Sequence, residues 1–173
     1  PRTLAPTLPP FGDLAVDGPT DTVLVTNGFV IGEFRGDPPC PAAPGTPKNT
    51  YVVPPIPNSA ATGIMGGLTG LGMDSAGGIL WVTDGSDIAG LSGVLLASGT
   101  CTPPAVAVPA FASGLPGAPF LTDLTWDPAS GSLWVCDTTG TVSNVAVGGG
   151  PGAGGSFVAA GACGLTSSLT GIA

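Results

Sequence analysis

Three aspartates recur at one position of a repeated pattern, and they are the first residues with a type and spacing suited to chemistry. Asp17, Asp74 and Asp127 each stand eight residues before a valine in an apolar run. Carboxylates gathered in one place could hold calcium, because this hard cation binds several oxygen ligands. An aspartate that begins a turn instead accepts hydrogen bonds from nearby backbone N–H groups. The three recur in separate units rather than together, so we favour the turn interpretation.

Other polar residues flank these aspartates at fixed offsets. A polar residue follows the second apolar run of each copy, and we expect it to terminate a strand: Asn27, Asp84 and Asp137. Asp13 and Asp123 stand near the start of the first run, where the other copies have Gly70 and Gly171.

The residue types needed for nucleophilic catalysis are missing. The sequence has no histidine, so neither a Ser-His nor a Cys-His pair can form. No GxSxG sequence is present, and Lys48 is the only lysine. The glycine-rich stretch 148–155 is not followed by GK[ST], so it does not match a phosphate-binding loop. We therefore predict a protein that is not an enzyme and uses no cofactor.

The four cysteines are the remaining chemical candidates. Their even number predicts two disulfides, and we favour Cys136 with Cys163 and Cys40 with Cys101. The other two pairings, and four unpaired thiols, remain alternatives. A structural zinc site is not expected, because the sequence has no CxxC spacing and no histidine.

Charge and composition exclude several classes of partner. The net charge is −8, and the only cations are Arg2, Arg35 and Lys48, which argues against nucleic-acid binding and against anionic membrane surfaces. No apolar stretch is long enough for a transmembrane helix. A lysine-poor chain with an even number of cysteines predicts a secreted, extracellular protein. The chain begins at Pro1, which we interpret as a processed protein or a fragment, and O-linked glycan remains open.

The elements that must position these residues are strands. Residues 12–27, 69–84 and 122–137 align without a gap, and each reads as an apolar run, a Gly-, Pro-, Ser- and Asp-rich turn and a second apolar run. That pattern predicts a β-hairpin. Two further strands are expected after each hairpin, at 29–34 and 50–53, at 93–97 and 105–111, and at 141–147 and 156–160. Pro109 assigns its strand to a sheet edge.

The predicted fold is all-β, with three four-stranded antiparallel units in an array. We place an extended proline-rich segment at 1–10, units at 11–58, 59–118 and 119–165, and the first strand of a further unit at 166–173. Units of this kind at roughly 50-residue spacing are typical of β-propeller blades.

The pattern T-[GD]-L-x-x-D-x-x-x-G-x-L-W-V-x-D is carried by 69–84 and 122–137, and more loosely by 12–27. It resembles the blades of NHL-repeat and gluconolactonase-like β-propellers. In the lactonases, carboxylates at inner-strand ends, an Asn and a Glu gather a divalent metal. Here the only glutamate is Glu33, in a third strand, and the matching metal-ligand motifs cannot be placed. The resemblance therefore implies a fold more than an activity.

Tryptophans occupy fixed positions of the same pattern. Trp81 and Trp134 share one repeat position, and Trp126 precedes Asp127. We expect all three to pack between blades, with a sugar-binding platform as the alternative.

Three blades cannot close a propeller ring, so the sequence is part of something longer, or two or more copies complete one another, or the units stack as an open array. The predicted assembly strand comprises Leu169, Thr170, Gly171, Ile172 and Ala173. Such an unpaired strand can add to another chain or to the first unit of the same chain. The favoured hypothesis is a secreted structural protein that self-associates into a closed oligomer or a filament. The alternatives are a propeller that binds sugar or protein, and a metal-dependent lactonase-like hydrolase.

Overall fold

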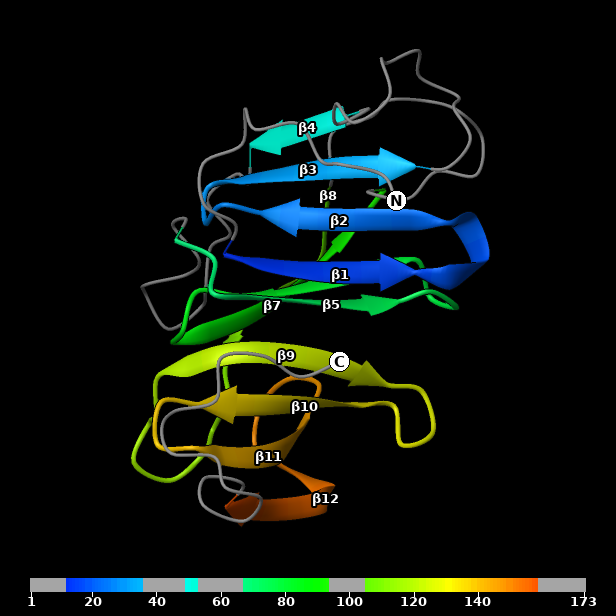
Figure 1. Ribbon diagram of the computed structural model, residues 1–173. Coiled ribbons are helices and arrows are strands. Elements are labelled where there is room, and N and C mark those ends of the chain that lie inside the picture. The colour runs from blue at the N-terminus through cyan, green and yellow to red at the C-terminus, as the bar shows by residue number, and fades with distance from the viewer. Residues whose placement is uncertain (1–11, 36–48, 53–66, 94–104, 159–173) are drawn as a thin grey trace.

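The computed structural model describes residues 12–35, 49–52, 67–93 and 105–158 (Figure 1). Within these ranges the regular structure is β, apart from one 3-10 turn at Gly18–Thr20. The first sheet contains β1 (Asp13–Asp17), β2 (Thr22–Thr26), β3 (Val30–Arg35) and β4 (Asn49–Val52). The second contains β5 (Gly70–Asp74), β6 (Ile79–Thr83), β7 (Asp87–Ser92) and β8 (Ala105–Ala112). The third contains β9 (Leu121–Asp127), β10 (Ser132–Asp137), β11 (Thr141–Ala146) and β12 (Pro151–Val158).

Each sheet is an antiparallel meander in which consecutive strands are neighbours. The prediction of an all-β chain with three antiparallel four-stranded units is therefore confirmed. Pro109 lies in β8 at the edge of its sheet, as expected from its missing N–H. The predicted segments 1–10 and 166–173 lie outside the described residues.

Two strand predictions were wrong. The third strand of the second sheet is Asp87–Ser92, not 93–97, because it follows directly after the turn at Asp84. The fourth strand of the third sheet begins at Pro151 rather than 156. Gly148, Gly149 and Gly150 have positive φ angles and form the turn before it. The strand needs glycine at 154, because a Cβ there would lie 2.6 Å from the Trp134 ring.

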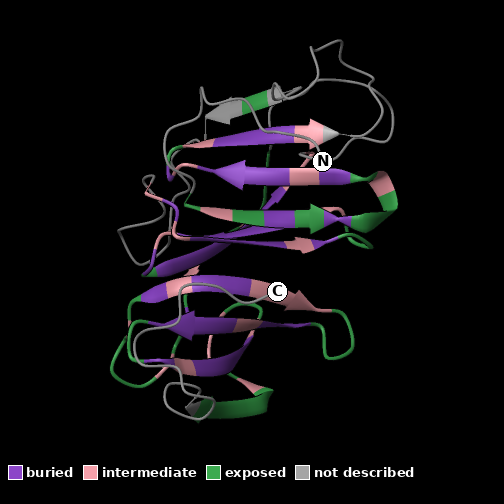
Figure 2. Cartoon of the chain, viewed as in Figure 1, coloured by how far each residue is buried: buried purple, intermediate pink, exposed green. Residues whose placement is uncertain are grey.

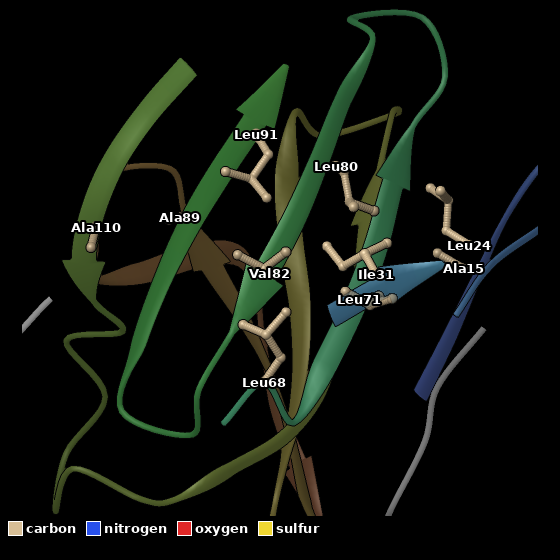
Figure 3. Close-up of a cluster of buried hydrophobic side chains, with 10 residues drawn as sticks. All are labelled: Ala15, Leu24, Ile31, Leu68, Leu71, Leu80, Val82, Ala89, Leu91 and Ala110. Carbon is tan, nitrogen blue, oxygen red and sulfur yellow. The ribbon is translucent and has the colours of Figure 1, made fainter. Parts of the chain in front are cut away.

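The three sheets meet through their first strands. β5 lies between β1 and β9, and Figure 1 shows these strands side by side at the centre of the chain. Two apolar cores fill the spaces between successive sheets. The core between the first two sheets contains Ala15, Leu24, Ile31, Leu68, Leu71, Leu80, Val82, Ala89, Leu91 and Ala110 (Figure 3). The core between the last two contains Trp81, Ile88, Leu121, Leu124, Leu133, Val135 and Val145.

Glycines let β5 and β9 approach closely. A Cβ placed on Gly70 would lie 2.6 Å from the Asp123 Cα, and one on Gly72 would lie 2.7 Å from a Leu124 methyl carbon. The nearest atom to Gly70 is backbone, which cannot rotate away. The second sheet therefore requires glycine at the start of its first strand.

Gly70→Ala should destabilise the fold by about 1–3 kcal/mol, because the added methyl forces the β5 and β9 backbones apart. Urea unfolding measures this difference in free energy. Gly18→Ala is the matched control, since a Cβ there meets nothing within 4 Å. Equal stability of the two variants would show that the β5–β9 distance is adjustable.

Candidate functional site

The structure brings two predicted carboxylates together where the three sheets meet. Asp13 begins β1 and Asp123 lies near the start of β9, and their side chains are hydrogen-bonded to each other. Asp13 Oδ2 also accepts the Leu71 N–H of β5 at 2.5 Å, and Asp123 Oδ1 accepts the Leu124 N–H at 2.7 Å. Side chains of the first and third sheets thus meet across the strand between them.

The sequence placed these two residues at equivalent positions but did not predict their contact. The sequence feature that could have indicated this contact is Gly70, which stands at the same repeat position in the copy between them. Gly70 has no side chain to cap the Leu71 amide, so Asp13 of the neighbouring sheet supplies the acceptor. This carboxyl pair, Asp13 and Asp123, is the most unusual chemical feature of the described residues.

Cys136 lies beside the carboxyl pair. Its side chain is fully buried at the end of β10, and its Sγ lies 3.1 Å from the Thr122 Oγ1. Burial raises the pKa of the Cys136 thiol, the Thr122 hydroxyl lowers it, and the carboxylates of Asp123, Asp137 and Asp13 raise it further. A thiol with a raised pKa is a poor nucleophile at neutral pH, because the thiolate is the reactive form.

Cys136 is free in the structure. The structure therefore does not show the predicted bond to Cys163, and in place of a disulfide the thiol occupies the position that threonine holds in the other copies. Thr26 and Thr83 use this position to accept the next glycine N–H, at 2.9 and 3.1 Å. Cys40, Cys101 and Cys163 lie outside the described residues.

Cys136 should resist alkylation by iodoacetamide in the native protein at pH 8 and react fully in denaturant. Burial removes access to the sulfur, and the raised pKa keeps it protonated. Peptide mass spectrometry of the Cys136 peptide measures the modified fraction. Rapid native modification would contradict the buried thiol, and a Cys136–Cys163 cross-linked peptide would restore the predicted disulfide.

The repeated aspartates form turns, as predicted. Asp74 Oδ1 accepts the Gly77 N–H at 2.9 Å, and Asp127 Oδ1 accepts the Ala129 N–H at 2.9 Å. Asp17 instead accepts the hydroxyl of Thr20. The three turns are separate, and no group of three or more His, Cys, Asp or Glu side chains in the described ranges is arranged to hold a metal ion.

The residues that end the second strands organise the next turn. Asn27 Oδ1 accepts the Phe29 and Val30 N–H groups at 3.0 and 2.9 Å. Asp84 Oδ1 receives the equivalent pair of amides at 3.0 and 2.9 Å, and Asp137 Oδ1 accepts two amides at 2.7 and 3.2 Å. A single side-chain oxygen therefore performs the same task in every sheet, whether it belongs to an amide or a carboxylate.

Asn27→Asp should leave stability nearly unchanged, because the same oxygen then accepts the same two amides. Asn27→Ala removes the acceptor and should cost about 0.5–1.5 kcal/mol. Urea unfolding of both variants at neutral pH measures the difference. Comparable losses in the two variants would show that the amide nitrogen of Asn27, not its oxygen, is required.

The tryptophans divide into two environments. Trp81 is buried between the second and third sheets and stacks on Trp126 with ring centroids 5.6 Å apart, which confirms packing for both. Trp134 does not lie between these sheets, so its packing between blades stays a prediction. It lies on the other face of the third sheet, 6.1 Å from the Phe157 ring, and its indole N–H donates to Asp127 at 3.3 Å. No described sheet follows the third, so Trp134 packs within its own.

Glu33 is fully buried in β3. In the described part of the chain, no helix is long and apolar enough to cross a membrane. No protein-family model matches the chain, and no curated protein matches it in sequence.

Proposed function

We propose that this chain is a secreted, non-enzymatic structural module whose three sheets are β-propeller-like blades, and that copies of it associate face to face. One observation carries the proposal. The outer face of the first sheet has the apolar pattern of a face that packs against a blade, but its first-strand side chains are exposed.

Equivalent positions of the repeat support this interpretation. Leu14 is 57% exposed, whereas its counterparts Leu71 and Leu124 are 2% and 0% exposed inside the two cores. Val16 is also 57% exposed, and its counterpart Trp126 packs against the core between the second and third sheets. Figure 2 shows the alternation of exposed and buried positions along β1, beside the mostly buried β5. The exposed face is thus built like two faces that other sheets already cover.

A second copy of the chain offers a matching surface. Within the chain, each such face packs against the opposite face of the preceding sheet, which presents Leu24 in the first sheet and Trp81 in the second. Trp134 stands at the same repeat position in the third sheet. The third sheet of one copy would then pack on the first sheet of the next, by the arrangement that joins the sheets internally. Two copies joined at both ends contain six blades, and a head-to-tail interface that does not close gives a filament.

Leu14→Glu with Val16→Glu should abolish association while leaving the fold intact, because both side chains are more than half exposed in the single chain. Sedimentation velocity at micromolar concentration measures the mass, with wild type expected to be dimeric or larger. Phe29→Glu is the matched control, since Phe29 is 64% exposed but lies in the turn between β2 and β3. A monomeric wild type, or equal loss of association in the control, would overturn the proposal.

A further inference from the structure

The carboxyl pair joins two sheets that are not consecutive. Asp13 belongs to the first sheet and Asp123 to the third, and β5 of the second sheet lies between their strands. Because Gly70 has no side chain, the Asp123 backbone can lie directly against β5. A Cβ at Gly70 would be only 2.6 Å from the Asp123 Cα. The Leu71 N–H holds the Asp13 carboxylate from the other side at 2.5 Å. Both carboxyl groups are therefore held in place by backbone.

A hydrogen bond between two carboxyl groups requires a proton on one of them. When both are ionised, two negative charges lie within contact distance, and one of them must bind a proton or move away. Two acidic groups on β10 lie near the pair, because the carboxylates of Asp13, Asp123 and Asp137 all raise the pKa of the Cys136 thiol. On β5 the Leu71 amide donates to Asp13.

We propose that Asp13 and Asp123 form a proton-dependent contact that holds the first sheet against the other two. With one shared proton, the two carboxyl groups bind each other and the Leu71 amide stays capped. Loss of that proton replaces the hydrogen bond by repulsion, and the start of β1 moves away from β5 and β9. The proton passes to solvent, and no other group changes its covalent state.

The direction of titration agrees with this geometry. Burial raises the pKa of the Asp13 carboxyl above its ordinary 3.8, and this outweighs the lowering by hydrogen bonds from Asp123, Leu71 and Leu14. The folded protein then binds more protons than the unfolded chain between the two pKa values. The stabilisation is complete below the unfolded pKa of about 3.8 and is lost as pH rises through the raised folded pKa. Most carboxylates in proteins act in the opposite direction.

The NMR titration of the two carboxyl carbons tests the contact directly. In wild type we expect coupled titration, with the apparent pKa of Asp13 above 3.8. Asp123→Asn removes the like charge but keeps a hydrogen-bonding side chain of similar size. In that variant the coupled two-step titration should disappear, and Asp13 should titrate in a single step. Independent titration of the two groups at ordinary pKa values would overturn the proposal.

Urea unfolding between about pH 4 and about pH 7 provides a second readout. The wild-type midpoint should contain a component that falls as pH rises, and Asp123→Asn should reduce it, because the repulsion between two carboxylates is gone while Asp13 stays buried. Asp127→Asn is the control, because hydrogen bonds from Ser130 lower the pKa of this exposed carboxylate and its contribution is lost as pH falls. The Leu71 amide should also lose protection from hydrogen exchange at the higher pH in wild type alone. Identical pH profiles in wild type and Asp123→Asn would refute the proton-dependent contact.

Discussion

The arrangement of this protein depends on satisfying backbone N–H groups where three separate sheets meet. Among the described strands, the first strand of each sheet has one ladder partner, so its other edge carries amides that none of these strands pairs. In the third sheet Asp123 caps the amide that follows it. In the second sheet a side chain at that position would collide with β9, so Gly70 leaves the Leu71 amide to Asp13. Close packing and backbone capping are thus met by different residues in adjacent sheets.

The repeat made much of this fold predictable. Strands β2, β6 and β10 form in the second apolar run of each aligned copy, as predicted. Each combines β-branched or aromatic residues with an Asp-based turn on one side and a polar terminator on the other. The errors arose where composition and position disagreed. Residues 93–97 are more apolar than Asp87–Ser92, yet the strand forms where the preceding turn directs the chain. Glycines at 152 and 154 concealed a strand because they make room for Asn144 and Trp134.

The candidate site was less predictable because it forms between repeats. Asp13 and Asp123 are 110 residues apart in the sequence, and each alone resembles an ordinary strand-end aspartate. Their contact depends on the close approach of β5 to both neighbours, which is a property of the assembled sheets. The environment of Trp134 was also not predictable from its place in the repeat. It shares a repeat position with Trp81, but the third sheet has no described neighbour on that face, so an identical residue has a different environment.

A stack of sheets that contact only their neighbours behaves as a one-dimensional array, in which stability is a sum of unit and interface contributions. The contact between Asp13 and Asp123 adds a coupling that skips one unit. Separation of the first sheet then changes the third directly, even when the second stays folded. Unfolding of this chain is consequently cooperative between the first and third sheets, and not only between adjacent sheets. The strength of that coupling depends on pH.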